Sequence, residues 1–519
     1  MYRYLLAALA AVCAYSADFD ILIRNARVID GSGNPWFHAD VGIRDGRIEA
    51  VGRLNGRTAY RTIDADSRVV APGFIDVHTH IEGAVEKVPR ADNYMLDGVT
   101  TVVTGNCGAS EVNLGQWFGK IEKLGLGINV GSLIGHNAVR REVMGSANRL
   151  ASPEEISRMQ AIVDQAMRDG AVGFSTGLIY TPGTYSNTAE VVALAKAASK
   201  YGGVYASHMR DEGAKVLDAI NEAVTVGKEA GVPVELSHFK IDNRRLWGSS
   251  MRSIELVEKY RSEGVDVVVD QYPYDRSSTD LATQVPSWAL ADGIPALRKR
   301  LADPDTRTRI VSDMQKRIDT LGQPDYTFAT VASYPPDHSL DGKTIPAIAA
   351  IKGKPAGVSG QIDTILEMMD KGGAQMIYHS MGMEDMERIM RYPNTAFASD
   401  GGIREFGAGM PHPRAYGTNA RVLAEYVRER RTLTLEDAIR RMTSLPARTF
   451  GLADRGLLRP GMTADVVIFD PAKVQDKSTF ADPHHYSEGF DFVLVNGKIA
   501  VEDGKPTDVR AGKVVRRQG

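Results

Sequence analysis

Residues 72–80 read PGFIDVHTH, and this stretch decides the fold that we expect for the chain. A short apolar run leads into Asp76 and ends on two histidines, His78 and His80. Side chains two apart in an extended segment point to the same face, so both imidazoles face one side of the strand. Two imidazoles at this spacing can hold one metal ion, although a histidine pair alone is equally common as a structural feature. The stretch predicts a buried strand with a candidate metal site at its carboxyl end.

Seven further runs of the same kind follow downstream. They are VTTVVTGNCG (99–108), INVGSLIGH (128–136), AVGFSTGL (171–178), GVYASHM (203–209), VPVELSHF (232–239), VDVVVDQYPY (265–274) and TAFASDGG (395–402). Mostly continuous apolar runs are typical of parallel strands buried on both faces. Helical segments separate most of them, and one opens on Ser152, Pro153 and Glu155, the residues of a capping box with proline at the first helical position. Eight strands alternating with helices predict an α/β fold, a TIM-like (β/α)8 barrel, with a doubly wound open sheet as the alternative.

The two ends of the chain differ from this middle part because they alternate apolar and polar residues between turns. Two dipeptides are typical of two-residue hairpin turns, Asp45-Gly46 and Asn496-Gly497. We expect both ends to form one small β-sandwich, and a stretch that breaks the strand-and-helix rhythm to form an inserted lobe late in the barrel. The expected boundaries are 18–70 and 451–519 for the sandwich, 71–450 for the barrel and about 285–357 for the insertion.

Residues 1–16 are typical of a secretory signal peptide. Arg3 supplies a positive charge, an apolar run follows, and Ala14 and Ser16 place small residues at the cleavage positions. We therefore expect an exported protein, periplasmic or secreted. A retained anchor, a lipoprotein modified at Cys13 and a misplaced start codon are the alternatives. No other apolar run approaches the roughly 18 residues that span a membrane.

The composition excludes several classes of protein. The 519 residues carry a net charge of −3 and no long basic run, which argues against nucleic acid as the main partner. The 51 glycines and 23 prolines show no period, so collagen-like and low-complexity classes are excluded. The two cysteines are Cys13 and Cys107, and removal of a signal peptide would leave Cys107 without a disulfide partner. Self-association into a homo-oligomer is left open.

Polar side chains end five of the eight predicted strands. They are His78, His80, Cys107, His208, His238 and Asp400. In a closed barrel all six converge on one mouth, where barrel enzymes keep their catalytic groups. Each alone has a structural alternative: a small buried cysteine, a core histidine or an aspartate that caps a helix. Together they predict a metal site, and the thiolate and imidazoles suit zinc.

Several motifs carry a resemblance to a known family. PGFIDVHTH, GNCG, YASHMRDEG, ELSHFK, YPY, ASDGG and PHPR resemble the D-aminoacylase branch of the amidohydrolase superfamily, the N-acyl-D-amino-acid deacylases. The resemblance covers residue 18 to the C-terminus. It implies a distorted zinc-bearing barrel with a β-sandwich built from both chain ends. It also implies hydrolysis of small N-acyl-D-amino acids, or of dipeptides with a C-terminal D-residue, to release the D-amino acid.

The resemblance also implies the roles of the metal-site residues. Cys107, His208 and His238 would hold one tight zinc ion, and His78, His80 and Asp400 would line a second, weakly metallated position. Asp400 would act as general base and then acid toward a zinc-activated water. Many binuclear members bridge their metals with a carboxylated lysine on strand four, but here that strand ends in FSTG (174–177), and Cys107 would replace it.

Further residues are candidates for substrate recognition. Lys240 lies two residues after His238, and Arg414 can bind a carboxylate through two parallel hydrogen bonds. The resemblance implies that the carboxylate of the amino-acid half meets Tyr180, Lys240, Tyr272, Ser278 and Arg414. Tyr185 competes with Tyr180 for this assignment. His136 is either a donor behind the site or a packing residue, and we expect Asp211 and Glu212 to cap the following helix.

Two rival functions have less support from the sequence. A cyclic-amide hydrolase such as a hydantoinase is disfavoured by the missing strand-four lysine and by the presence of Cys107. A non-catalytic scaffold is disfavoured because such relatives typically lack metal ligands, whereas all six candidates are present here.

Overall fold

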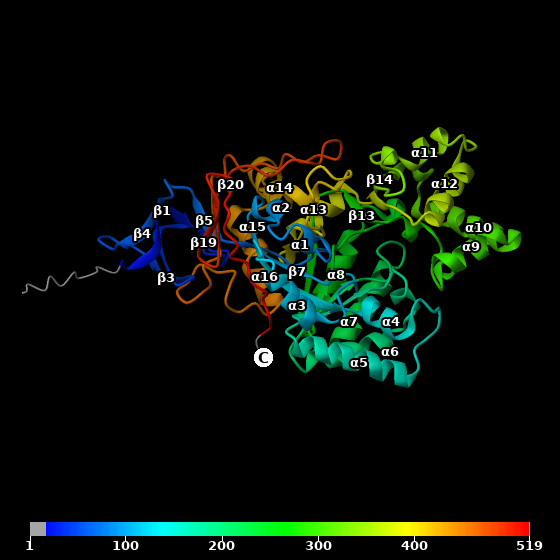
Figure 1. Ribbon diagram of the computed structural model, residues 1–519, viewed down its shortest axis with the longest axis horizontal. Coiled ribbons are helices and arrows are strands. Elements are labelled where there is room, and N and C mark those ends of the chain that lie inside the picture. Colours follow the sequence, from blue (N-terminus) through cyan, green and yellow to red (C-terminus); the bar gives the residue numbers. More distant parts are fainter. Residues whose placement is uncertain (1–16, 518–519) are drawn as a thin grey trace, which may run out of the picture.

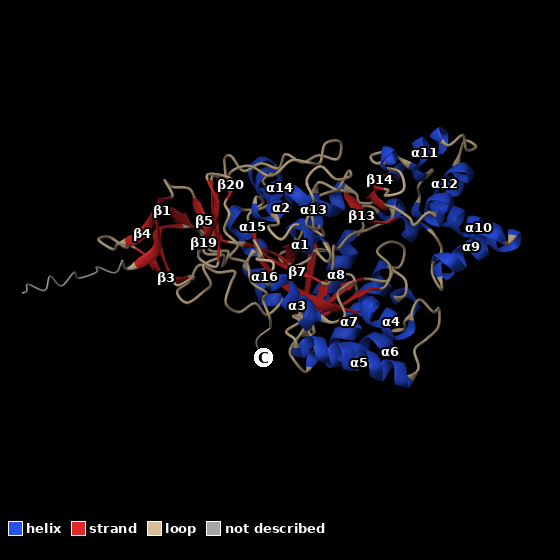
Figure 2. Ribbon diagram, in the orientation of Figure 1, coloured by secondary structure: helices blue, strands red, loops and turns tan. Residues whose placement is uncertain are grey.

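The computed structural model describes residues 17–517 and arranges them in three parts along its longest axis (Figure 1). A β-sheet unit built from both chain ends lies at one end, the barrel lies in the middle, and a mostly helical lobe lies at the other end (Figure 2). The predicted signal peptide, residues 1–16, lies outside the described residues. Within the described part of the chain, no helix has the length and apolar character to cross a bilayer.

Eight parallel strands form the barrel, in the spatial order in which they follow one another along the chain. They are β6 (Phe74–Asp76), β7 (Val99–Thr104), β8 (Asn129–Gly135), β9 (Gly173–Gly177), β10 (Val204–His208), β11 (Val234–Leu236), β12 (Val267–Gln271) and β16 (Thr395–Phe397). The first and last strands meet through a parallel bridge between Thr79 and Gly401, and His80 N donates to Gly401 O at 2.7 Å. The predicted barrel is therefore confirmed, and the open-sheet alternative is wrong.

Helices cover the outside of the barrel. They are α1 (Ala84–Lys87), α2 (Asp92–Met95), α3 (Leu114–Glu122), α4 (His136–Met144), α5 (Pro153–Arg168), α6 (Thr188–Ser199), α7 (Val216–Ala230), α8 (Ser250–Ser262), α13 (Met383–Arg391), α14 (Arg414–Arg421), α15 (Leu435–Met442) and α16 (Ser444–Thr449). The predicted capping box starts α5, with Ser152 Oγ accepting from Glu155 N and Glu155 Oε2 accepting from Ser152 N. The helix buries Met159 and Val163 on the face toward the barrel, as expected for a helix with one apolar side.

Both chain ends contribute to one nine-stranded sheet. Its strands are β1 (Phe19–Val28), β2 (Phe37–Arg44), β3 (Arg47–Gly52), β4 (Ala59–Asp64), β5 (Val69–Pro72), β17 (Val466–Phe469), β18 (Phe490–Val495), β19 (Lys498–Glu502) and β20 (Lys505–Pro506). The ends join where β5 pairs antiparallel with β17, Val70 opposite Ile468. Two-residue turns link β2 to β3 and β18 to β19, and Asp45 and Asn496 take the positive φ of 50° and 49° that such turns need.

The inserted lobe is larger than the sequence predicts. It contains α9 (Ile294–Ala302), α10 (Pro304–Leu321), α11 (Ile345–Ile351), α12 (Val358–Asp370), β13 (Arg276–Asp280), β14 (Ala329–Ser333) and β15 (Gln375–His379). Its own apolar core extends from Leu281 to Tyr378. The predicted range 285–357 misses β13 and β15, which pair with each other at the entry and exit of the insertion. The RSSTD sequence of β13 has no apolar alternation, so only this long-range pairing defines it as a strand.

Candidate metal and substrate site

The carboxyl ends of the barrel strands bring the six predicted ligands to one mouth. His78 and His80 follow β6, Cys107 follows β7, His208 ends β10, His238 follows β11, and Asp400 follows β16. Their ligand atoms form three groups in which the atoms lie within 4.8 Å of one another: His78, His80 and Cys107; Cys107, His208 and His238; His78, His238 and Asp400. Because the three groups share residues, they form one continuous cluster.

Cys107 lies at the centre of this cluster. Its Sγ is 3.3 Å from His78 Nε2 and 3.6 Å from both His208 Nδ1 and His238 Nε2. Cys107 and all three histidines around it are buried. Three soft or borderline donors around one point, closed off from water on most sides, match the donor set that zinc prefers.

The backbone is unusual at three of the six residues. Cys107, His238 and Asp400 have positive φ values of 53°, 38° and 49°. Residues with a Cβ rarely adopt this left-handed region, and such conformations gather at functional sites. These three residues follow three different strands, and their side chains belong to one cluster.

The buried carboxylate of Asp270, which was not among the predicted site residues, contacts two residues of the cluster. Asp270 Oδ2 lies 2.8 Å from His78 Nδ1, and Asp270 Oδ1 accepts a hydrogen bond from His238 N at 2.7 Å. This contact leaves His78 Nε2 free to face Cys107 and Asp400. An acidic residue inside the apolar run VDVVVD was the available signal, because a carboxylate buried in a strand needs a partner.

Glu212 has a different role from the helix capping predicted for it. It does not cap α7; its carboxylate is buried between His208, His238 and Lys240. Asp211 does bind the backbone instead, accepting from Gly213 N and Lys215 N at 2.8 Å each. The helix begins only at Val216, so Glu212 lies in the loop before the helix.

The charges of the site favour ionised thiolate and carboxylate groups. Burial raises the pKa of the Cys107 thiol, but His78, His208 and His238 outweigh this effect and hold the pKa well below its usual range. Burial also raises the pKa of Asp400, and Arg414 together with His78 lowers it to well below the usual range of a carboxyl group. Both groups are thus set up to act as anions, as metal ligand or as proton acceptor.

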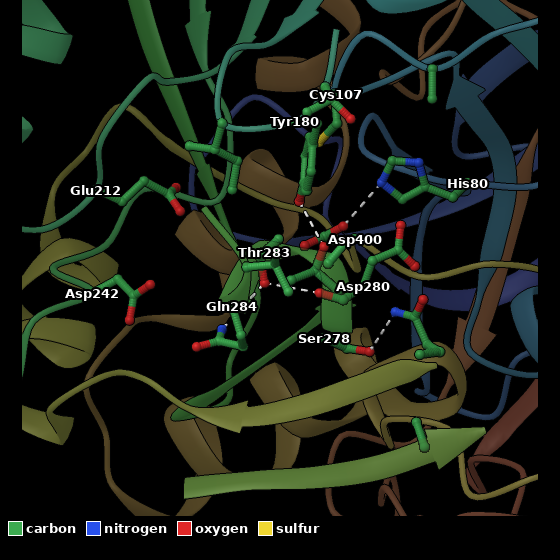
Figure 3. A pocket seen from close by; sticks show the side chains of 18 of the residues that line it. His80, Cys107, Tyr180, Glu212, Asp242, Ser278, Asp280, Thr283, Gln284 and Asp400 are labelled. Carbon is green, nitrogen blue, oxygen red and sulfur yellow. Dashed lines mark hydrogen bonds and ion pairs between the residues drawn. The ribbon is translucent and has the colours of Figure 1, made fainter. Parts of the chain in front are cut away.

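A cavity of about 1280 Å³ opens above the cluster, between the barrel mouth and the inserted lobe. In Figure 3, Cys107 and Tyr180 lie on one wall, His80 and Asp400 on a second, and Glu212 with Asp242 on the opposite side. The lobe contributes Ser278 and its neighbours to the remaining wall (Figure 3). The site is therefore a composite of barrel loops and insertion.

The five predicted substrate-binding residues divide into two sets. Tyr180, Ser278 and Arg414 line the cavity. Lys240 and Tyr272 lie outside the set of described residues that line it. The Lys240 ammonium contacts Glu212 Oε1 at 2.7 Å and His238 Nδ1 at 2.9 Å.

Arg414 connects the catalytic and recognition sides of the cavity. Its Nη1 lies 2.9 Å from Asp400 Oδ2, its Nη2 donates to Ser278 O at 3.1 Å, and its guanidinium stacks 4.5 Å above the Tyr272 ring. The buried Tyr272 hydroxyl has no hydrogen-bond partner among residues 17–517. Because Arg414 lines the cavity, its guanidinium is placed to meet a carboxylate ligand there.

His136 belongs to a separate buried network. Its Nε2 lies 2.8 Å from Glu190 Oε1, and Arg140 Nη1 donates to the same carboxylate. The network ties α4 to α6, so of the two interpretations the packing role fits the contacts of His136.

An eight-stranded barrel that gathers histidine, cysteine and aspartate at the carboxyl ends of its strands has the architecture of a metal-dependent hydrolase. The donor atoms fit a divalent cation because Cys107, His208 and His238 point one soft or borderline donor each toward a shared centre. Sequence comparison makes the class specific. The profile of the amidohydrolase family matches residues 61–501, and the chain belongs to this family.

Individual relatives match the chain over nearly its full length. It is 33% identical to a D-aminoacylase of Alcaligenes xylosoxydans xylosoxydans, covering 97% of this chain and 98% of the relative. It is 36% identical to an N-acyl-D-glutamate deacylase of the same organism, covering 96% of each. The crystal structure of an N-acyl-D-glutamate deacylase from Bordetella bronchiseptica, complexed with zinc and a phosphonate inhibitor that mimics the tetrahedral intermediate, superposes with a TM-score of 0.82 at 33% identity. That match covers 96% of this chain and 99% of the other.

Proposed function

We propose that this protein is a zinc-dependent deacylase that releases a D-amino acid from N-acyl-D-amino acids or from dipeptides with a C-terminal D-residue. The observation that carries the proposal is the cluster of Cys107, His208 and His238 beside Asp400 and Arg414 in one cavity. Relatives named as D-aminoacylase and N-acyl-D-glutamate deacylase support the substrate class.

Two sets of residues would hold metal. Cys107, His208 and His238 would bind one tight zinc ion, and His78, His80 and Asp400 would line a second, weaker position. A divalent cation at this site supplies Lewis-acid activation of a water molecule and of the amide carbonyl. The protein residues around it position the substrate and move the proton.

Asp400 is the proposed proton carrier. Its Oδ1 faces His80 Nε2 at 3.2 Å and His78 Nε2 at 3.6 Å, while its Oδ2 is held by Arg414. One oxygen is therefore fixed by the guanidinium, and Oδ1 is left on the side of the metal cluster. Oδ1 takes the proton from the attacking water and returns it to the leaving amine, as a general base and then a general acid.

The amino-acid half of the substrate would lie against Arg414. The guanidinium would supply donors for its carboxylate, and Tyr180 and Ser278 line the same cavity. Lys240, the other cationic residue predicted for this role, is paired with Glu212 instead. A carboxylate held on one side and an acyl carbon held over the cluster would fix the scissile amide between them.

The decisive experiment is a panel of N-acetyl-D-amino acids, N-acetyl-L-amino acids and L-D dipeptides, scored for released amine with zinc-loaded enzyme. We expect turnover of D-configured linear amides and little turnover of the L-forms. Hydantoin and dihydrouracil serve as the cyclic controls. Preferred hydrolysis of these rings would establish the cyclic-amide alternative, and a zinc-loaded protein inactive on every compound would support the scaffold alternative.

We also propose export from the cytoplasm, on the basis of residues 1–16 alone. Mass analysis of the protein isolated from its native host tests this proposal. An N-terminus at or near Ala17 is expected, and a soluble cytoplasmic protein that retains Met1 or Tyr2 would contradict it.

A further inference from the structure

We propose that Glu212 is a positioning residue that sets the ring orientation of both histidines in the predicted tight metal site. The inference rests on the proposed metal site and not on the identity of the substrate. No direct contact between Glu212 and substrate is required.

The two carboxylate oxygens of Glu212 each lie near a different histidine ring. Its Oε1 lies 2.9 Å from His238 Nδ1, and its Oε2 lies 3.4 Å from His208 Nε2. The other nitrogen of each ring, His238 Nε2 and His208 Nδ1, lies 3.6 Å from Cys107 Sγ. One carboxylate thus contacts the two rings on the sides that face away from the metal cluster.

Neither ring contact is a complete hydrogen bond in this structure, because His208 Nε2 has no hydrogen-bond partner among the described residues and Lys240 Nζ also lies 2.9 Å from His238 Nδ1. A neutral ring that binds a metal ion through the nitrogen facing Cys107 carries its N–H on the nitrogen beside Glu212, and an ionised carboxylate can accept that N–H. The two histidines therefore present different atoms, Nδ1 of His208 and Nε2 of His238. A metal-bound histidine commonly has a carboxylate or carbonyl partner behind it, and here one carboxylate serves two rings.

Lys240 offsets the free-energy cost of burying the Glu212 carboxylate. Glu212 is 7% exposed and Lys240 is 4% exposed, so both charges are buried. The Lys240 ammonium lies 2.7 Å from Glu212 Oε1 and 2.9 Å from His238 Nδ1, so it neutralises the carboxylate and shares that side of the His238 ring with it. Asp242 N also donates to Glu212 O at 2.7 Å and fixes the backbone at this point.

The test compares Glu212→Gln and Glu212→Ala with the full-length protein, and uses Asp211→Asn as the matched control. Asp211 is the adjacent acidic residue, but it contacts backbone amides rather than histidines. Zinc affinity is measured by competition with a chromophoric chelator in the absence of substrate. Nitrogen-15 NMR of labelled histidines reports the tautomer and the metal-bound nitrogen of each ring.

We expect both Glu212 variants to bind zinc roughly 10–100-fold more weakly, as for other partners of metal-bound histidines, and Asp211→Asn to be unchanged. Glutamine can accept from one ring only, because its amide NH₂ would face the other N–H or Lys240. Glu212→Gln should therefore alter the NMR signature of one histidine, while Glu212→Ala releases both.

Folded Glu212 variants with zinc affinity within about twofold of wild type and unchanged histidine signals would overturn the inference. If an unpaired Lys240 prevents folding, Glu212→Gln combined with Lys240→Met removes the buried charge and repeats the test. Weaker zinc binding in a protein that deacylates nothing on the substrate panel would refute the proposed function and keep this inference. Normal zinc binding with intact deacylation would do the reverse.

Discussion

Replacing Arg414 by methionine tests whether one guanidinium serves both the proton carrier and the substrate. Its Nη1 lies 2.9 Å from Asp400 Oδ2, and Arg414 also lines the cavity, where the proposed second contact is with the substrate carboxylate. Hydrogen bonds to charged groups are worth about 1.5–3 kcal/mol each. Since about 1.4 kcal/mol is a tenfold change in rate, each contact corresponds to roughly 10- to 150-fold in kcat/KM.

The two contacts separate when the substrate carboxylate is changed. An N-acetyl-D-amino acid uses both, so Arg414→Met should lose roughly the product of the two factors. The matching carboxamide lacks the charged partner and should lose only the factor from Asp400. Arg414→Lys serves as the control, because it keeps the positive charge without the planar fork.

Steady-state kinetics on the acid and the amide with wild type and both variants gives the result. Equal losses on acid and amide would refute the carboxylate contact. An amide that reacts as fast with the methionine variant as with wild type would refute the link to Asp400.

Three further changes give simpler outcomes. Cys107→Ala should leave zinc content well below stoichiometric by metal analysis and abolish most turnover, because the thiolate is one of three ligands of the proposed tight site; full zinc content with a normal rate would contradict the assignment. Asp400→Asn should retain zinc but lose roughly 10²–10⁴-fold in kcat, since an amide cannot carry the proton; near-normal kcat would remove Asp400 from that role. Asp465→Ala should lower the free energy of unfolding by about 3–5 kcal/mol in denaturant titration. It removes the carboxylate 2.8 Å from buried Arg455, which keeps Asp454 as its remaining ion-pair partner in the described part of the chain, and it leaves the donors Asn129 Nδ2 and Asn496 N without their acceptor; a loss below about 1 kcal/mol would show that this buried network contributes little to stability.

The parts of the fold that could be predicted were those with a local pattern. Buried parallel strands produce continuous apolar runs, and each hairpin turn has its own dipeptide, so barrel and sheet ends were both visible in the sequence. The six candidate ligands stood out because each follows such a run. The paired strands β13 and β15 had no comparable signal, since their pairing joins segments far apart in the chain.

The residues behind the ligands were harder to identify. Glu212 stands between a strand and a helix, where an acidic residue ordinarily caps the helix, and only the three-dimensional contacts assign it to His208 and His238. Lys240 lies two residues after His238, so the two side chains are expected on the same face of the strand. This spacing does not distinguish an ammonium that faces the substrate from one that pairs with a buried carboxylate, as Lys240 does with Glu212. The sequence spacing predicts which face of a strand a side chain is on, but it does not predict which residue of a neighbouring segment that side chain contacts.

The two glycines of the GNCG motif are required by the backbone conformation around Cys107 and not by any reactive group of their own. Gly105 and Gly108 flank Cys107 with φ values of 77° and 73°. A Cβ on Gly105 would lie 2.2 Å from Leu133 O, and one on Gly108 would lie 2.2 Å from Asn137 Oδ1. Both glycines are thus required by conformation and by close approach to the next strand and helix. The left-handed conformation of Cys107 between them costs on the order of 1–3 kcal/mol, which the surrounding packing must offset. This conformation places the thiolate beside the three histidines. The two glycines therefore contribute to the metal site by allowing the backbone conformation that Cys107 needs.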